Sequence, residues 1–160
     1  MGLGLGYASL DDMQAWAERV VARDPDFVIG ERDAPYLLRW WIVPRNEHQN
    51  VYLHWILRDD DDRALHDHPW ANTSYLIAGR YREITPEGTF IREPGSLITR
   101  QATDLHRLEL VDGEAAVSLF FTGPKVRDWG FQCPKGWVPW QEFTAGDNGE
   151  LVGRGCGEMG

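Results

Sequence analysis

The chain has 160 residues, 42% of them hydrophobic, and a formal net charge of −9 at pH 7. This length supports one compact core and is too short for two ordinary domains. The negative charge makes nucleic acid and anionic membrane surfaces poor partners, because both would be repelled. We therefore expect a single domain whose partner is a small-molecule ligand or substrate.

A helix is expected near the N-terminus. Ser9 and Asp12 have the spacing of a capping box, and apolar residues then recur at helical spacing as far as Asp24 and Pro25. The sequence therefore predicts one N-terminal helix within a helical extension over residues 1–30.

Short strands are expected from residue 31 to residue 145. This region contains runs of aromatic and β-branched residues, which are separated by turn signals such as Pro94-Gly95 and Asp112-Gly113. The expected strands cover residues 36–43, 51–57, 74–84, 89–92, 96–100, 106–111 and 115–122. The first two should pair as antiparallel neighbours, and so many short strands indicate a β-sandwich or a small barrel.

Two polar segments are expected to be exposed. The acidic run 59–62 lacks the alternating ligands and the fixed glycine of a calcium loop, so an exposed turn is favoured. From residue 146 onward the chain is rich in glycine and poor in apolar side chains, which cannot offset the entropy of ordering it. A flexible tail is predicted over residues 146–160.

The cysteines indicate a reducing compartment. Cys133 and Cys156 have no CxxC spacing, and the second lies in the glycine-rich tail, where disulfide geometry is hard to hold. We expect Cys133 to pack as a small hydrophobic residue and Cys156 to be inert.

No segment has the length and apolar character of a membrane span, and residues 1–13 lack the features of an export signal. These observations predict a cytoplasmic protein.

Three histidines form a candidate metal site. His66 and His68 are two residues apart in an extended segment, so their side chains share one face and can converge on one ion. His106 opens a later strand, which a barrel could bring beside this pair. Neutral imidazoles suit iron, zinc, nickel, copper or manganese better than calcium or magnesium. Asp67, between the first two histidines, should point the other way and anchor the loop.

This pattern resembles the cupin superfamily. Its first motif has an HxH pair followed by a carboxylate and a glycine, and its second motif has PxG followed by a histidine. His66, His68 and Gly79 fall on the first pattern, and Pro94-Gly95 with His106 loosely matches the second. The resemblance covers about residues 50–123 and implies an all-β fold, the double-stranded β-helix or jelly-roll barrel of cupins, here with an N-terminal helix.

The chain departs from the cupin motifs at one ligand. Asn72 or Thr73 stands where a metal-binding glutamate is usual, the second motif has PG in place of PxG, and its histidine comes late. The resemblance therefore implies a metal set of three histidines with an open side, filled by Asn72 or by water. The run HDHPWANTSYLIAGRYRE and the later HRLEL, FFTGP and WGFQCPKGW are similar to a group of small bacterial and phage-encoded cupin-type proteins.

Four residues are candidates for a substrate pocket beside this site. His54 shares a strand face with Tyr52 and Ile56, and lining the pocket is as favoured for it as plain packing. Trp70 follows the metal strand and offers an indole face to a planar or apolar ligand, with core packing as the alternative. The remaining two candidates are Asn72 and Arg80.

Charged side chains on the strands could take part in the chemistry. Tyr81 and Glu83 share one face of the strand after Gly79, so either could act as an acid or base if that face is the inner one. An inward arginine would bind a substrate carboxylate through its bidentate fork. The arginines in or beside expected strands are Arg58, Arg80, Arg100, Arg107 and Arg127.

Three functions stay open at this point. In cupins, three-histidine iron(II) centres are associated with dioxygenases, so the resemblance implies an oxygen-dependent enzyme that acts on a small chelating substrate. The second function is a non-catalytic module that binds a small molecule or a metal. The third is a non-redox isomerase or hydrolase that uses zinc, manganese or nickel as a Lewis acid. Cupins often pair through outer strands, so we expect a homodimer.

Overall fold

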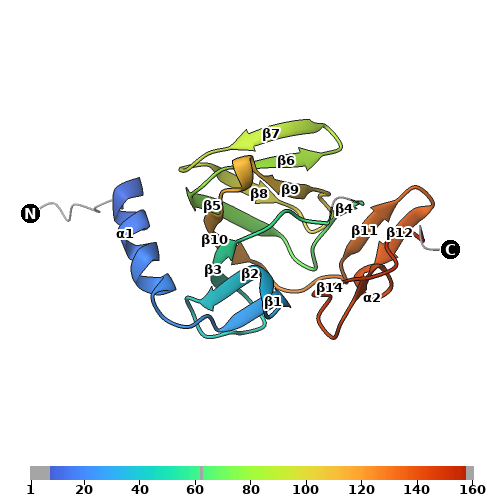
Figure 1. Cartoon of the computed structure of the whole chain (residues 1–160), viewed down its shortest axis with the longest axis horizontal. Coiled ribbons are helices and arrows are strands. Elements are labelled where there is room, and N and C mark those ends of the chain that lie inside the picture. Colours follow the sequence, from blue (N-terminus) through green and yellow to red (C-terminus); the bar gives the residue numbers. More distant parts are fainter. Residues whose placement is uncertain (1–7, 62, 158–160) are drawn as a thin grey trace, which may run out of the picture.

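The computed structural model describes residues 8–61 and 63–157, which form one N-terminal helix and a two-layered arrangement of antiparallel strands (Figure 1). Helix α1 (Leu10–Val21) begins with the predicted capping box: the Ser9 hydroxyl accepts from the Asp12 amide, and the Asp12 carboxylate accepts from the Ser9 amide. Within the described residues, no helix is long and apolar enough to cross a membrane.

The first layer is a six-stranded sheet in the order β1-β2-β3-β10-β5-β8, with every neighbouring pair antiparallel. Its strands are β1 (Phe27–Glu31), β2 (Ala34–Trp41), β3 (Asn50–Ile56), β5 (Asn72–Ala78), β8 (Leu97–Arg100) and β10 (Ala116–Thr122). The predicted antiparallel pairing of segments 36–43 and 51–57 is confirmed: they correspond to β2 and β3, with Trp41 opposite Tyr52 and Leu37 opposite Ile56.

The second layer has two small sheets, β7-β6-β9 and β12-β11-β4. Their strands are β4 (Leu65–His66), β6 (Tyr81–Thr85), β7 (Gly88–Arg92), β9 (Arg107–Leu110), β11 (Gly130–Cys133) and β12 (Gly136–Pro139). A 3₁₀ turn, η1 (Val111–Gly113), and a short helix, α2 (Trp140–Phe143), lie in the connections. A buried core joins the layers, because Leu37 and Leu76 of the first pack with Tyr81 and Leu110 of the second.

A glycine divides the long strand that was expected over residues 74–84. Gly79 has a φ of 73°, and a Cβ at this position would lie 2.3 Å from the carbonyl oxygen of Ala115. Only glycine avoids both the left-handed strain and this clash. The chain therefore leaves the first layer after β5 and enters the second layer as β6, which turns the Glu83 side chain toward the interior.

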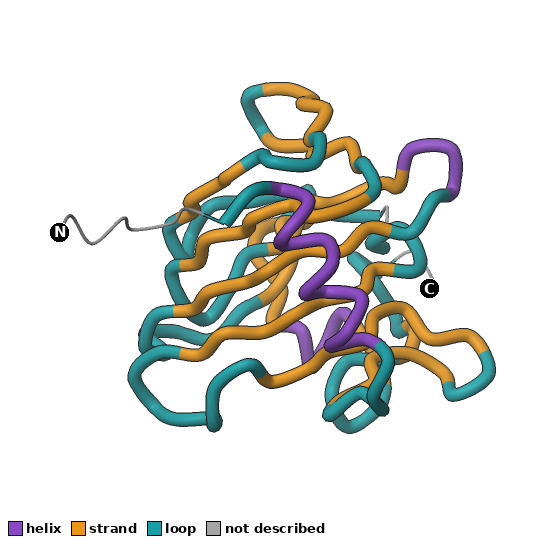
Figure 2. Tube along the Cα trace, turned by 90° about the vertical axis from the view of Figure 1, so that its left-hand side faces the viewer, coloured by secondary structure: helices purple, strands orange, loops and turns teal. Residues whose placement is uncertain are grey.

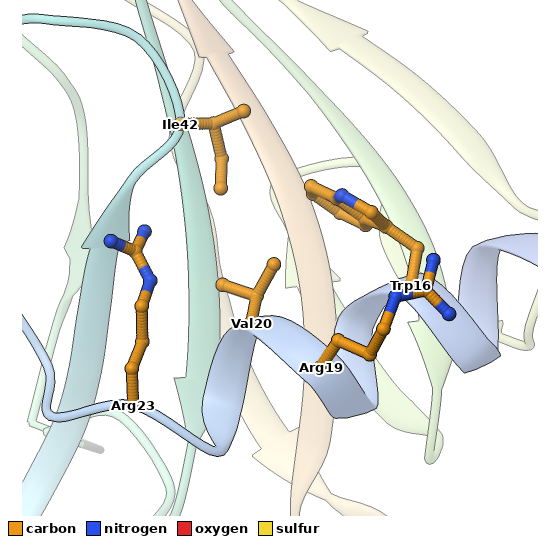
Figure 3. Close-up of a pocket in the computed structure, with 5 residues that line it drawn as sticks. All are labelled: Trp16, Arg19, Val20, Arg23 and Ile42. Atoms are coloured by element: carbon orange, nitrogen blue, oxygen red, sulfur yellow. The ribbon is translucent and has the colours of Figure 1, made fainter.

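Helix α1 covers the outer face of the six-stranded sheet, as Figure 2 shows where the helix crosses the strands. Ala17 forms a buried cluster there with Trp40, Leu53 and Ile77, which belong to three strands of the sheet. A hollow of about 300 Å³ remains on this outer side (Figure 3). It is lined by Trp16, Arg19, Val20, Arg23 and Ile42. The three histidines lie on the opposite side of the six-stranded sheet, so this hollow is not part of their site.

Residues 146–157 of the tail differ from the expectation, and residues 158–160 lie outside the described residues. Strands β13 (Thr144–Ala145) and β14 (Leu151–Val152) form a small antiparallel hairpin, and the Gly155 amide donates to the Phe143 carbonyl oxygen at 2.9 Å. The hairpin returns Cys156 to β11, where it forms a disulfide with Cys133 across a Cα–Cα distance of 5.5 Å. The prediction of two unpaired cysteines was therefore wrong, and the argument from the cysteines for a reducing compartment falls with it.

Loss of this disulfide should weaken the C-terminal part of the fold. A cross-link over 23 residues restricts the unfolded chain, so replacing Cys133 and Cys156 with serine should lower the free energy of unfolding by about 2–4 kcal/mol. Urea unfolding with and without a thiol reductant measures this loss. The reductant should destabilise the native protein and leave the double variant unchanged. Two titratable thiols in denatured, unreduced protein would contradict the pairing.

Candidate metal centre

Backbone pairing brings the three predicted histidines together. His66 ends β4, and His106 lies just before β9. The two residues form an antiparallel bridge, in which each backbone amide donates to the carbonyl oxygen of the other at 2.9 and 3.0 Å. His68 joins them from the same side, and one nitrogen of each ring lies within 4.8 Å of the others. The cluster is therefore fixed by main-chain contacts between segments that are 40 residues apart in sequence.

The chemical state of these rings fits a transition metal. Burial lowers the pKa of His68 well below its usual value and that of His106 to about 3, so both are neutral imidazoles near pH 7. Only the neutral ring has a lone pair for a metal. The Nδ1 atom of His68 is buried and has no hydrogen-bond partner in the described part of the chain. A buried polar atom without a partner is costly, and a bound divalent transition metal at this cluster would remove the cost.

Glu83 holds the third histidine from behind. Its carboxylate is 1% exposed, and its Oε1 accepts from Nδ1 of His106 at 2.8 Å. This contact fixes the ring and leaves Nε2 of His106 for an ion. Arg100 and Arg92 donate to the same carboxylate at 2.6 and 2.7 Å. Although burial alone raises the pKa of Glu83, the hydrogen bond from His106 and the charge of Arg100 lower it to about 2.

Arg100 is the inward arginine. It is 5% exposed, and besides Glu83 its NH1 group donates to Ser74 Oγ at 3.1 Å and to Asn72 Oδ1 at 3.3 Å. Asn72, at the position of the usual glutamate ligand, is therefore buried and oriented by Arg100. Arg80, which was predicted to line the pocket, instead has a side chain that is 42% exposed and lies 3.7 Å from Asp112. It precedes β6 at the end away from His106, so the structure does not bring it to the site.

Asp60 is a site residue that the sequence did not reveal. Its Oδ2 atom lies 3.8 Å from Nδ1 of His66 and accepts from the Leu108 amide at 2.7 Å. The neighbouring Asp59 accepts from the Leu110 amide at 2.6 Å. The acidic run is thus not simply an exposed turn, because two of its carboxylates bind the backbone of β9. No local signal marks this role, since the partners lie about 50 residues later.

Asp67 points away from the cluster, as predicted. It is 2% exposed, and its two carboxylate oxygens accept from the Gly130 amide at 2.8 Å and from the indole of Trp137 at 2.9 Å. Arg127 pairs with the same carboxylate. The loop that carries His66 and His68 is therefore anchored to β11, β12 and the segment before them.

Aromatic rings border the histidines. Trp70 stacks on His68 with ring centroids 5.5 Å apart, and Phe120 lies 5.5 Å from Trp70 and 4.9 Å from His54. His54 is buried, and its Nε2 atom accepts from Nε of Arg39 at 2.9 Å. The structure thus places the predicted pocket residues His54 and Trp70 on the same side of the cluster.

The Tyr81 ring packs in the core, but its phenol lies beside the residues that hold His106. This residue is 1% exposed and packs between the layers with Leu76 and Leu110, and its phenol is close to Arg100 and Glu83. Burial raises the pKa of its phenol. A groove of about 470 Å³ approaches the site from the other direction and is lined by, among others, Glu83, Arg92 and His106. The groove therefore reaches the Glu83 side of the centre and does not include Tyr81.

The buried neutral histidines predict a pH-dependent stability of the metal-free protein. The pKa of His54 is lowered well below 6.5 by burial first and by the charge of Arg39 second. Below about pH 6.5 the unfolded chain therefore binds more protons than the native state, so stability should fall as the pH falls. Replacing His54 with glutamine should remove one of these protons. Below about pH 6.5, the slope of the unfolding free energy against pH should then be smaller by about 1.4 kcal/mol per pH unit. Urea unfolding between pH 4 and pH 8 measures both slopes, and equal slopes would contradict the neutral His54.

Known structures share this fold. No family model and no curated protein matches the sequence. The DMSP lyase DddQ from Ruegeria pomeroyi DSS-3 is similar with a TM-score of 0.58 and 12% identity, over 82% of this chain and 72% of that chain. Rru_A2000 from Rhodospirillum rubrum, a cupin-2 domain, has a TM-score of 0.56 and 15% identity, over 69% and 76%.

A cupin superfamily protein from Desulfitobacterium hafniense DCB-2 has a TM-score of 0.50 and 10% identity, over 68% of this chain and 87% of that chain. At such identities the likeness concerns the fold alone. The resemblance seen in the HxH segment is confirmed at that level. The chain has the fold of the cupins, and its cluster of His66, His68 and His106 is compatible with a three-histidine metal site.

Proposed function

We propose that this protein is a metal-dependent cupin enzyme that oxidises a small chelating substrate with dioxygen. The observation that supports this proposal is the donor set: within the described residues, the candidate metal group consists of His66, His68 and His106, with no carboxylate among them. Three neutral ligands do not offset the charge of a bound divalent ion, and they leave coordination positions open for exchangeable ligands. Iron(II), the first choice, would supply a Lewis acid and an electron donor at this place.

The residues around the cluster have distinct tasks in this proposal. Glu83 keeps the His106 ring in one orientation and one tautomer, because Nδ1 donates to its carboxylate. Trp70 and Phe120 shield one side of His68 with apolar surface and so exclude bulk water. Asn72 has an Nδ2 group without a partner in the described chain, and this group can donate to a substrate oxygen.

The same geometry supports oxidation over proton-transfer chemistry. An isomerase or hydrolase would need an acid or base at the site, and Glu83 and Tyr81 were the candidates. Both oxygens of Glu83 are engaged and its pKa is about 2, so it is a poor proton carrier near pH 7. The Tyr81 phenol lies beside Arg100 and Glu83, and burial raises its pKa, so it is a poor base near pH 7. We therefore assign Glu83 a positioning role. A non-catalytic binding module remains as the function that a negative activity test would support.

The test combines metal analysis with oxygen uptake. Protein purified without an affinity tag or chelator is analysed for iron, zinc, nickel and manganese, and is then offered small thiols, diketones and phenolic acids in an oxygen electrode. Near-stoichiometric iron with substrate-dependent uptake is expected. Zinc or nickel with anaerobic turnover would replace the proposal by Lewis-acid chemistry, and absence of metal or turnover would leave a binding module. The double variant with His66→Ala and His106→Ala serves as the control that lacks the metal site.

A further inference from the structure

A second charged group lies beside the site. Arg39 of β2 stands directly opposite His54 of β3 in the sheet, and its Nε donates to Nε2 of His54 at 2.9 Å. The guanidinium lies over the ring of Tyr52 at 4.6 Å and near that of Phe27 at 6.0 Å. These contacts orient the plane of the guanidinium and use only one of its three nitrogens.

The charge of Arg39 has no counter-charge. Within residues 8–61 and 63–157, no carboxylate forms an ion pair with it, and its NH1 and NH2 groups donate no hydrogen bond. Arg92 and Arg100, in contrast, share the carboxylate of Glu83. Burial lowers the pKa of Arg39 to about 10, so the group is still protonated near pH 7. A partly buried cation without an anion is costly, and in a chain of net charge −9 a carboxylate partner would have been easy to supply.

A series of ring contacts connects Arg39 to the histidine cluster. His54 stacks on Phe120 at 4.9 Å, and Phe120 lies 6.3 Å from the ring of His68 and 5.5 Å from that of Trp70. One side of the site thus carries a cation at one end, aromatic surface in the middle and the metal-binding rings at the other end.

We infer that Arg39 is the anion-binding residue of the substrate site and that the substrate is a small carboxylate with an apolar or aromatic body. This inference rests on the proposed function. The free NH1 and NH2 groups form a fork that matches the two oxygens of a carboxylate. The apolar body lies against Phe120 and Trp70, and the chelating end reaches the three histidines.

Metal-free protein provides the test, since a bound metal would itself attract a carboxylate. Protein dialysed against EDTA is titrated with benzoate and with neutral benzamide by isothermal calorimetry. Benzoate should bind to the native protein and at least about tenfold more weakly to Arg39→Gln, because two charge-assisted hydrogen bonds are lost. Benzamide should bind both proteins equally. Arg39→Lys, which keeps the charge without the fork, should fall between them.

Arg32→Gln is the matched control. Arg32 is exposed in the turn between β1 and β2, so this variant removes the same charge without touching His54 or Arg39. Its benzoate affinity should match that of the native protein. No benzoate binding, an unchanged affinity in Arg39→Gln, or an equal loss in Arg32→Gln would overturn the inference. If Arg39→Gln fails to fold by near-ultraviolet circular dichroism, Arg39→Lys takes its place, and an unchanged benzoate affinity in that variant would overturn the inference. If the protein takes up no metal and shows no turnover but still binds benzoate, this result would support the anion site and would overturn only the proposed enzymatic function.

Discussion

Replacing His66 and His106 together with alanine should reduce the bound metal from about one equivalent per chain to almost none. Two of the three nitrogens that lie within 4.8 Å of one another are then lost, and His68 alone cannot hold an ion against water. The backbone bridge between the two positions does not depend on the side chains, so the variant should still fold. Elemental analysis of the purified protein, with circular dichroism as a check on folding, measures this result.

The control for this variant is His48→Ala. His48 lies in an exposed turn, and its replacement removes one imidazole without approaching the cluster. The metal content of this variant should equal that of the native protein. Full occupancy in the double variant would place the metal somewhere else and would remove the basis of the proposed function.

Glu83→Gln should weaken both metal binding and the fold. The glutamine keeps the shape of the side chain but cannot neutralise Arg100 and Arg92, which leaves two cations beside a buried amide. Breaking a buried ion pair on one side costs about 3–5 kcal/mol of unfolding free energy. The His106 ring also loses its charged partner, so metal affinity should fall about 10–100-fold. Urea unfolding of metal-free protein and competition with a chelator measure the two effects separately.

Glu87→Gln provides the comparison. Glu87 is exposed in the turn between β6 and β7, and it lines the same groove as Glu83. The charge removed is the same, but no arginine loses a buried partner, so stability and metal affinity should both stay close to the native values. If Glu83→Gln bound metal as tightly as the native protein, the hydrogen bond to His106 would have no part in preparing the site.

The sequence predicted those features that depend on short-range patterns. Ser9 and Asp12 are three residues apart, and this spacing alone indicates where α1 begins. The alternation of side chains in an extended segment places His66 and His68 on one face and Asp67 on the other, whatever the rest of the chain does. The central strands were predicted to within a few residues for the same reason, because each carries a run of aromatic and β-branched residues.

Features that depend on distant pairing could not be predicted in this way. Asp60 reaches Leu108, and Cys156 reaches Cys133, through turns whose direction no local pattern reports. Strand β4 has only two residues, too few for an alternating pattern to stand out. No local pattern marks Arg39, which stands among tryptophans and leucines, and its missing counter-charge becomes visible only when its neighbours in space are known.

The position of Asp67 has a consequence for how this protein can vary. The segment His66-Asp67-His68 faces inward, outward and inward, and its outward carboxylate is held by Gly130 and Trp137. Inserting or deleting one residue just before it would reverse every side chain, so that a carboxylate entered the cluster and both imidazoles left it. Changes of chain length should therefore be excluded from this stretch and accumulate instead in the turns between β6 and β7 or between β13 and β14.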